Sequence, residues 1–510
     1  MPRWSALLDR GHRLEEGMLR NPLLLTALGL TSVVALWGVF DTESLARLAQ
    51  AQVAQQFRSR AWFIMLMTSL VVVTVLTLAF SRFGAIRLGR DDERPEFSTL
   101  SWLTMLFAAG MGVGLLFYGA AEPLTHYQLV SGRAESDLAA SYALVTTIFN
   151  WGLHAWSIYA ITALVIAYFS YRKGRPGLVS SPIRYTFRRG RWVGALAWVA
   201  DLLAIYAIAI GLAGSLAIGV FQVEGGLGHL FGITGDWVRY LVFGALCLAF
   251  LAPLTLDLGR GMALLSNLAM AIALGLMVYL LLVGPTHYLM NGVVDTLGAY
   301  LSGVVQQGFA TYPFFGKAFQ DWFHGWTLNY MVWWIAWAPF VGVFVARISR
   351  GRTIREFVFG VVLVPTLFSL LWFGVFGGTG FYALLREGLP LLEVVRERPE
   401  DTTFFVLEAL PLAWLTGSAS MIAAFLFLVT SVVSAAYVLA MFSTSGDEDP
   451  PVRVKLAWGV LLALLGLAML LADDVTTVRA IIALGAMAFV FILPLLVVAL
   501  LKTLMREERR

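Results

Sequence analysis

Two stretches of the sequence concentrate tryptophan and tyrosine at helical spacing. The first holds Trp151, Trp156 and Tyr159, and the second holds Trp326, Tyr330, Trp333, Trp334 and Trp337. At about 100° per residue, the aromatic residues of the first stretch fall on one broad helix face. Two such faces opposite each other would form a cage for a desolvated cation. A quaternary ammonium suits this cage best, because it has no N–H to donate and ring quadrupoles can hold it without a carboxylate.

Tryptophan is also common in the belts where membrane proteins cross the lipid–water interface. That interpretation fits Trp326, near the outer end of its stretch. It fits Trp333, Trp334 and Trp337 less well, because they lie about one to two helical turns further in.

Three glycines at alternate positions, Gly110, Gly112 and Gly114, lie inside an apolar stretch. Each weakens a helix by about 1 kcal/mol relative to alanine, and together they let the backbone unwind and approach a ligand. Irregular backbone at membrane depth occurs only where it is buried in protein or lines a cavity. The alternative is close helix packing, but that motif repeats every four residues rather than every two. We therefore expect a broken helix here, as in transporters with half-helices at the midplane.

The adjacent hydroxyls of Thr430 and Ser431 could coordinate a hard cation beside freed backbone carbonyls. The alternative is that each hydroxyl bonds back to its own helix, which is common in membranes. Groups suited to catalysis are nearly absent from the apolar stretches. The six histidines are scattered without metal-ligand spacing, and the single cysteine, Cys247, excludes an intramolecular disulfide. We expect Glu122 to lie at the outer end of its helix, and no enzyme is indicated.

The composition places these residues in a membrane. Hydrophobic residues make up 59% of the 510 residues and charged residues 13%, with a mean hydropathy of +0.78. Soluble domains carry about 25% charged residues, so a soluble enzyme and a disordered protein are excluded. The formal net charge of +4 is also too small for a nucleic-acid binder.

Twelve segments are apolar enough to span a membrane, since a spanning helix needs about 20 residues. They are 22–40, 61–81, 100–120, 140–169, 193–222, 238–256, 262–283, 327–346, 356–376, 411–442, 456–472 and 480–501. Most Lys and Arg residues fall in alternate loops, so the positive-inside rule predicts that both termini are cytoplasmic. The stretch 286–326 predicts an amphipathic helix at the outer surface. We expect a multi-pass protein of a bacterial cytoplasmic (inner) membrane.

Four motifs resemble the betaine/choline/carnitine transporter family. They are Phe107-Ala-Ala-Gly-Met-Gly-Val-Gly-Leu-Leu-Phe-Tyr-Gly119 followed by Glu122-Pro123, Trp151-Gly-Leu-His-Ala-Trp156-Ser-Ile-Tyr159, the tryptophan-rich segment 326–342, and Ala346-Arg-Ile-Ser-Arg-Gly-Arg-Thr-Ile-Arg-Glu356. The resemblance covers roughly residues 20–500. It implies a secondary active transporter of trimethylammonium compounds or related sulfonium osmolytes, working by alternating access as a homotrimer.

The resemblance also implies the organisation of the chain. The expected fold is an all-α integral membrane, LeuT-like arrangement of inverted five-helix repeats, helices 3–7 and 8–12, after two N-terminal helices. One transmembrane domain would comprise N-terminal helices (1–99), first repeat (100–284), outer amphipathic helix and linker (285–326), second repeat (327–501) and a short cytoplasmic tail (502–510).

Site residues follow from the same resemblance. The substrate box resembles Trp151, Trp156, Tyr159 and Trp334, with Trp333 and Trp337 along the path and Gly110, Gly112 and Gly114 in the broken helix. A sodium site resembles the carbonyls of Ala108, Met111 and Phe427 with the hydroxyls of Thr430 and Ser431. No cofactor is expected beyond sodium as the coupling ion.

Some positions depart from the family pattern. Gly114 stands where proton-coupled choline carriers tend to have an acid, which favours a zwitterionic betaine. Ile208 and Leu212 stand where members with two sodium sites have threonines, which favours one sodium per substrate. A sodium-independent exchanger of carnitine or betaine, and a carrier of choline or sulfonium osmolytes, remain as alternatives.

Overall fold

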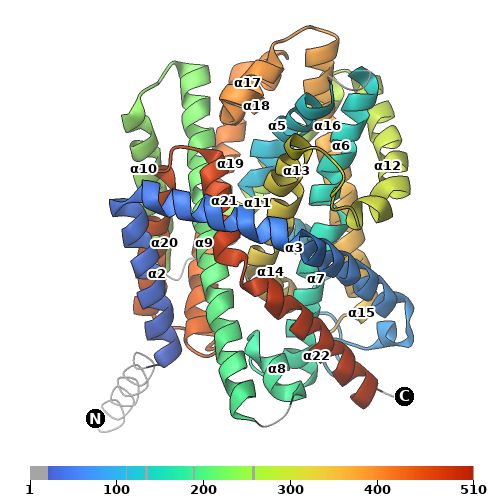
Figure 1. The fold of residues 1–510 in the computed structure, drawn as a ribbon, viewed down its shortest axis with the longest axis vertical. Helices are drawn as coiled ribbons and strands as arrows, with labels where there is room; N and C mark the ends of the chain where they lie inside the picture. The colour runs from blue at the N-terminus through green and yellow to red at the C-terminus, as the bar shows by residue number, and fades with distance from the viewer. Residues whose placement is uncertain (1–20, 111, 132–135, 188–189, 256–258, 509–510) are drawn as a thin grey trace.

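The computed structural model, drawn in Figure 1, describes most of the chain. The described residues are 21–110, 112–131, 136–187, 190–255 and 259–508. They form helices joined by short loops, and the β pairing among them is one bridge between Arg87 and Thr353. The predicted all-α fold is confirmed.

Two N-terminal helices, α2 (Pro22–Phe40) and α3 (Thr42–Phe80), precede the rest of the bundle. The helices of the first predicted repeat are α4 (Thr99–Gly110), α5 (Val113–Val130), α6 (Ser136–Trp151), α7 (Leu153–Ala167), α9 (Arg191–Phe231), α10 (Asp236–Thr255) and α11 (Gly259–Val283). The outer helix is α12 (Thr286–Gly308). Helix α13 (Lys317–Phe323) lies in the predicted linker. The helices of the second predicted repeat are α14 (Asn329–Ile348), α15 (Ile354–Val358), α16 (Val364–Leu385), α19 (Ala413–Ser443), α20 (Val452–Leu470), α21 (Val475–Ala486) and α22 (Ile492–Glu507). Short helices α8 (Ser180–Thr186), α17 (Leu391–Glu397) and α18 (Thr402–Glu408) lie in the connections.

Among the described residues, 11 helical segments are long and apolar enough to cross a membrane. They correspond to eleven of the twelve predicted spans. The remaining prediction, 100–120, falls on α4 and α5, which are separate helices. The predicted spans 140–169 and 480–501 fall on segments that are not single straight helices. The first is interrupted at Gly152, and the second is built from α21 and α22 with a short 3-10 turn between them.

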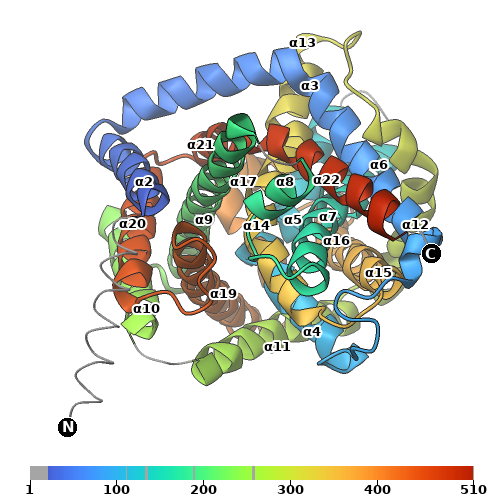
Figure 2. The same cartoon turned by 90° about the horizontal axis from the view of Figure 1, so that it is seen from below.

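The central and peripheral helices differ in burial. In the most apolar window of α9, 89% of the residues are buried, against 33% in α10 and in the window within α11. Figure 2 accordingly shows α7, α9 and α14 inside the bundle and α2, α3, α10 and α11 around it. The long helix α3 crosses the outside of the bundle obliquely and packs on α7 and α21. The first half of α3 is more polar than the predicted span 61–81. Hydropathy therefore predicted only the second half of this helix.

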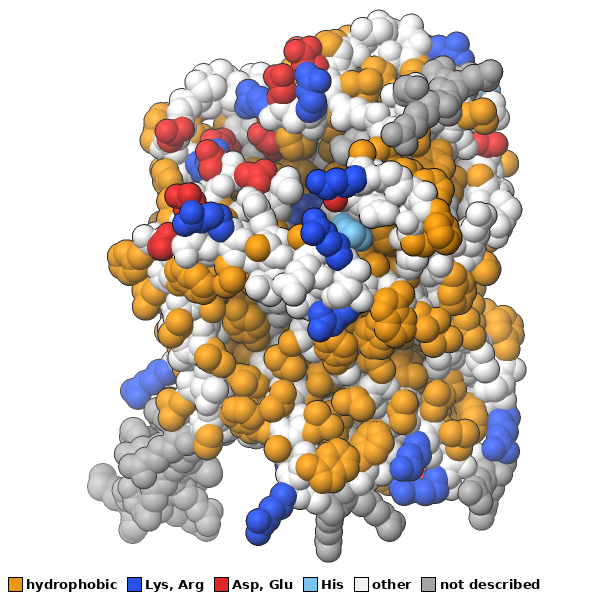
Figure 3. Space-filling view, viewed as in Figure 1, with side chains coloured by type: hydrophobic (Ala, Val, Ile, Leu, Met, Phe, Trp, Pro, Cys, Tyr) orange, Lys and Arg blue, Asp and Glu red, His pale blue; other side chains and the backbone are white. Residues whose placement is uncertain are grey.

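Side-chain types are distributed unevenly over the surface. Figure 3 shows one face on which acidic side chains gather in the upper part, above a broad band of mainly hydrophobic side chains. Lys and Arg side chains lie both among the acidic ones in the upper part and at the lower edge of the band. The band fits a lipid-facing surface, since a soluble protein rarely exposes so large an apolar patch.

The predicted amphipathic helix is α12, between the two sets of spans. One of its faces packs on α6 and α16. The other face exposes Val294, Leu301 and Val305, each more than half accessible in the single chain. The helix therefore links the predicted repeats and also presents an apolar surface away from the bundle.

Candidate functional site

The two aromatic stretches meet in the centre of the bundle, where α14 packs on α7. The ring of Trp334 lies 5.0 Å from that of Trp151 and 5.8 Å from that of Tyr159, and both pairs meet edge to face. Trp156 completes the group at 5.7 Å from Tyr159. We call Trp151, Trp156, Tyr159 and Trp334 the aromatic box. Each is less than 9% exposed, so a cation inside the box would be largely desolvated.

The two other predicted tryptophans lie on different sides of the box. Trp333 stacks on Tyr330 at 5.9 Å, and Tyr330 in turn stacks on Trp334 at 5.7 Å. Trp337 instead lies against α9, where a Cβ built at Gly211 would come within 3.1 Å of its ring. Its indole Nε1 is buried and has no hydrogen-bond partner. Trp333 thus extends the aromatic cluster, whereas Trp337 fills the contact with α9.

The helix break expected at the three glycines is present. Helix α4 ends at Gly110 and α5 begins at Val113, with Gly112 extended at φ −112° and ψ −163°. Residue Met111 lies outside the described residues. No side chain caps α5, so its first backbone N–H groups have no capping partner. A Cβ built at Gly114 would lie 2.9 Å from Trp151, which places this helix start beside the aromatic box.

A second break lies at Gly152, immediately after Trp151. Gly152 has φ −101° and ψ −131° and separates α6 from α7. The hydroxyl of Tyr300, on α12, accepts a hydrogen bond of 3.0 Å from the backbone N–H of Leu153. A Cβ at Gly152 would lie 2.7 Å from the same hydroxyl, so glycine is required for this approach. A single glycine in an apolar run gave no sequence signal for the break.

The prediction that Glu122 lies at the end of its helix is wrong, because α5 continues to Val130 and Glu122 lies in its middle. Its fully buried carboxylate accepts hydrogen bonds from the Tyr330 hydroxyl at 2.6 Å and the Trp151 indole at 2.8 Å. The side-chain amide of Asn150 donates a third bond, of 2.9 Å. The backbone oxygen of Asn150 also accepts the indole N–H of Trp334 at 2.7 Å. Glu122 and Asn150 together fix two of the three box tryptophans, Trp151 and Trp334, by their N–H groups.

A fourth donor to this carboxylate is His126. Its Nδ1 lies 3.0 Å from the indole nitrogen of Trp322, and its Nε2 lies 3.1 Å from Glu122. Because an indole can only donate, Nδ1 must accept, and in a neutral imidazole the proton is then on Nε2. The Nε2–H group therefore donates to Glu122. The network runs from α13, through α5, to the aromatic box.

One buried cation lies at the outer side of the cluster. Arg479, on α21, holds its guanidinium carbon 4.0 Å from the ring of Trp326 and 5.5 Å from that of Tyr330. It also donates a 2.6 Å hydrogen bond to the backbone oxygen of Gly325. The predicted spans 456–472 and 480–501 leave residues 473–479 between helices, and this boundary is wrong for Arg479 because α21 begins at Val475.

The predicted sodium ligands are described only in part. Phe427, Thr430 and Ser431 lie on the continuous helix α19, Ala108 lies on α4, and Met111 is outside the described residues. The hydroxyl of Thr430 lies 3.0 Å from the backbone oxygen of Leu426 and 3.1 Å from that of Phe427. It therefore bonds back to its own helix, and the sodium site stays a prediction. Over the described part of the chain, no group of three or more His, Cys, Asp or Glu residues is placed to hold a metal ion.

A bundle of spans with an aromatic site at its centre and a helix broken beside it defines a multi-pass membrane transporter, since such proteins build midplane sites from discontinuous helices. The chain matches the family described as BCCT, betaine/carnitine/choline family transporter, over residues 22–509, and it belongs to this family.

Several relatives are named for the compound that they transport. The chain is 39% identical to the glycine betaine transporter OpuD of Bacillus subtilis over 485 residues, which cover 94% of each protein. It is 37% identical to the glycine betaine transporter of Acinetobacter baylyi, over 88% of this chain and 67% of that one. It is 35% identical to the ectoine/hydroxyectoine transporter of Virgibacillus pantothenticus, over 88% and 89%. The family and these relatives are transporters and not enzymes.

We predict that Glu122→Leu disorders the box. The substitution leaves the N–H groups of Trp151 and Asn150 and the hydroxyl of Tyr330 without an acceptor, and each unsatisfied buried group costs about 1–3 kcal/mol. The apparent KM for transported substrate should rise at least tenfold, and the thermal midpoint in detergent should fall. Glu122→Gln retains one acceptor oxygen and should be milder in both. The exposed Glu43→Leu is the control, and equal effects at Glu43 and Glu122 would contradict the positioning role.

Proposed function

We propose that this chain imports a glycine betaine-type zwitterion by sodium-coupled alternating access, binding the trimethylammonium group in the aromatic box. One observation carries the proposal. The indole N–H groups of Trp151 and Trp334 are already bonded to Glu122 and to the backbone of Asn150. Trp151 and Trp334 therefore offer a ligand their ring faces rather than their N–H groups, and the buried hydroxyl of Tyr159, which has no partner among the described residues, is a polar group left at the box. A quaternary ammonium, which can form no hydrogen bond, is the cation that loses least in such a site.

The carboxylate of the zwitterion needs donors, and the start of α5 can supply them. The uncapped N–H groups of this helix lie beside Trp151, where the helix dipole is positive. A Cβ at Gly112 would meet nothing within 4 Å, so there is free space next to this backbone. Gly110, Gly112 and Gly114 would then form the anionic end of the site. A bare cation such as choline would face the same positive helix end without a compensating charge.

The substrate is proposed from the site and from the relatives. Two of the relatives described above are named for glycine betaine, and one is named for ectoine and hydroxyectoine. Glycine betaine is our first choice because the box suits a trimethylammonium group. Uptake of labelled glycine betaine, ectoine, carnitine and choline into proteoliposomes, with and without sodium, would rank the substrates. Uptake driven only by internal substrate would identify an exchanger instead.

One sodium per substrate is proposed for the coupling. The retained site would use Ala108, Met111, Phe427, Thr430 and Ser431. A second site on α9 has no oxygen ligands, because Ile208 and Leu212 are buried and aliphatic. A sodium ion placed there would be desolvated without compensation.

We also propose that the chain lies in the bacterial inner membrane with both termini in the cytoplasm, as a homotrimer. On the face in Figure 3, both signs of charge lie above the apolar band and mainly Lys and Arg lie at its lower edge, and this asymmetry supports the orientation. The exposed apolar face of α12 supports a neighbour at that helix. Chemical cross-linking of the membrane-embedded protein would test the trimer.

We expect Trp334→Leu to weaken substrate binding roughly tenfold or more. The substitution removes one desolvated cation–π contact of about 2 kcal/mol, and each 1.4 kcal/mol changes affinity about tenfold. Trp334→Phe keeps a ring face and should be milder. Both variants are compared by apparent KM at matched expression. Equal losses in Leu and Phe would show that the ring face does not hold the substrate.

Two glycine variants distinguish an effect on the space beside α5 from an effect on the packing of Trp151. Gly112→Val should fold normally, because its backbone is extended and its Cβ meets no neighbour, yet it should abolish uptake by filling the space beside α5. Gly114→Ala should raise KM by displacing Trp151, which its Cβ would approach to 2.9 Å. Thermal midpoints and uptake are measured for both, with Gly244→Val, also in open space, as control. Near-normal uptake by Gly112→Val would exclude the broken segment from binding.

Sodium dependence should have a Hill slope near one, with about one net charge moved per zwitterion. Thr430→Ala should raise the sodium concentration for half-maximal uptake, because it removes a proposed ligand. Thr416→Ala is the matched control, since Thr416 lies on the same helix and also bonds back to it. A slope approaching two would reveal a second sodium site, and uptake indifferent to sodium would favour the exchanger.

A further inference from the structure

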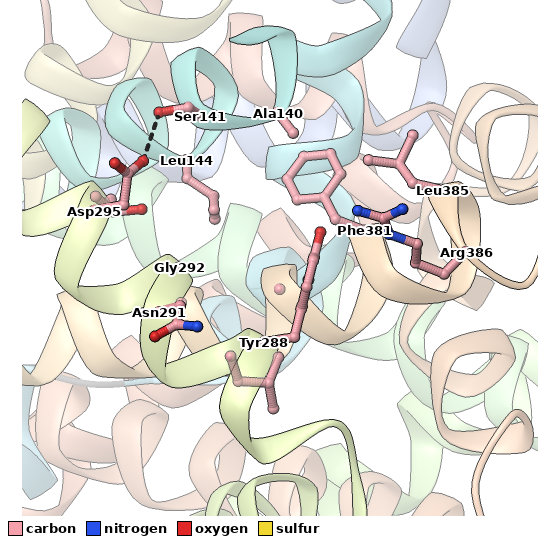
Figure 4. A pocket seen from close by; sticks show the side chains of 14 residues that line it. Ala140, Ser141, Leu144, Tyr288, Asn291, Gly292, Asp295, Phe381, Leu385 and Arg386 are labelled. Carbon is pink, nitrogen blue, oxygen red and sulfur yellow. Dashed lines mark hydrogen bonds between the residues drawn. The ribbon is translucent and has the colours of Figure 1, made fainter. Parts of the chain in front are cut away.

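A cavity of about 290 Å³ lies outside the aromatic box, between α12, α6 and α16. Its size is at the lower end for small-molecule sites in proteins. Ser141 and Leu144 of α6, Asn291 and Asp295 of α12, and Phe381 and Arg386 at the end of α16 contribute to its wall (Figure 4). None of these residues belongs to the proposed transport site.

The cavity contains one charge of each sign. Asp295 accepts a hydrogen bond of 3.2 Å from Ser141. In the view of Figure 4, Arg386 lies on the opposite side, with the rings of Tyr288 and Phe381 between the two charges. Within the described ranges, neither Asp295 nor Arg386 takes part in an ion pair. Both charges are thus free to meet a ligand that carries an ammonium and an anionic group.

Each of the three helices that line this cavity also reaches Trp151 or the helix break beside it. Helix α6 ends at Trp151 itself. Helix α16 carries Phe373, whose ring lies 5.2 Å from that of Trp151. Helix α12 carries Tyr300, one turn beyond the cavity residue Thr296. The hydroxyl of Tyr300 accepts a hydrogen bond from the backbone N–H of Leu153, at the second helix break. A molecule that changed the spacing of these helices would therefore also change the aromatic box.

We propose that this cavity is a second ligand site that modulates transport. It would take a small dipolar group, with the ammonium near Asp295 and the aromatic rings and the anion on Arg386. The same chemistry occurs in free glycine betaine and in the headgroup of phosphatidylethanolamine. Occupancy acts on the box through Tyr300, Phe373 and the end of α6.

At about 100° per residue, the exposed Val294, Leu301 and Val305 lie about 40–120° around α12 from Asn291 and Asp295, so the apolar face borders the cavity. A second copy of the chain that covered this face would lie next to the cavity, and the test below therefore includes packing between copies as an outcome.

Two glycines on α12 provide the test and its control. Gly292 lines the cavity, and a Cβ there would meet nothing within 4 Å, so Gly292→Leu should fill the cavity without a clash. Gly298 has equally free space but lies on the exposed face, so Gly298→Leu serves as the control. The double variant Asp295→Asn with Arg386→Gln removes the charges and leaves the volume unchanged.

The first arm tests a free ligand. Equilibrium dialysis of labelled glycine betaine against the full chain, in nanodiscs of phosphatidylglycerol alone, should give two equivalents per chain. Gly292→Leu and the charge variant should give one, and Gly298→Leu should still give two.

The second arm tests a lipid headgroup. Uptake is measured in vesicles of phosphatidylglycerol with and without phosphatidylethanolamine. If the headgroup is the ligand, the wild-type KM should change by about fivefold or more with phosphatidylethanolamine, and the KM of Gly292→Leu should not.

A positive result in either arm supports the site and identifies its source. The proposed site would be overturned if the wild type and every variant bound one equivalent of glycine betaine and their KM values responded equally to phosphatidylethanolamine. A change of oligomeric mass in Gly292→Leu with unchanged binding would instead assign the cavity to packing between copies. If the wild type bound two equivalents of glycine betaine but showed no uptake, the proposed transport function would be refuted and the second site would still be supported.

Discussion

The structure of the binding region depends on one buried carboxylate. An ion removed from water costs several kcal/mol unless its lone pairs are satisfied, and Glu122 meets this requirement with donors from four side chains, on α5, α6 and α14. Removing the carboxylate would leave several polar groups without a partner at once. The conformations of Trp151 and Trp334 are therefore set by a polar network behind the rings as well as by contacts between the rings.

Trp151 and Trp334 each use the N–H edge of the indole for binding to the protein. These bonds fix the two rings in place, so a ligand would meet their faces and not their N–H groups. A rigid site of this kind loses little side-chain entropy on binding. The network also extends through His126 to the half-buried Trp322 on α13, so the box is connected to a helix outside the pair that forms it.

Local signals in the sequence were sufficient for the spans, the amphipathic helix and the break at Gly110 to Gly114. Hydropathy and glycine spacing act over a few neighbouring residues, and both can be read without the fold. The partners of Glu122 could not be found in this way, because Tyr330 is 208 residues away in the sequence. The break at Gly152 also depends on a distant group, the hydroxyl of Tyr300. The burial of Arg479 follows from its ring contacts and could not be inferred from a short, charged connection.

The two helix breaks have a mechanical consequence. They lie at Gly110–Val113 and at Gly152, and each separates two helices with different neighbours. Beyond the breaks, α5 and α6 pack on each other and on α16, whereas α7 packs on α14 and α3. Bending at both glycine joints would let these two blocks tilt relative to each other as rigid bodies, with no sliding inside either block. Trp151 lies next to the joint at Gly152. The same small rotation that opens one side of the protein would therefore also move Trp151 and weaken the contact between the aromatic box and its substrate.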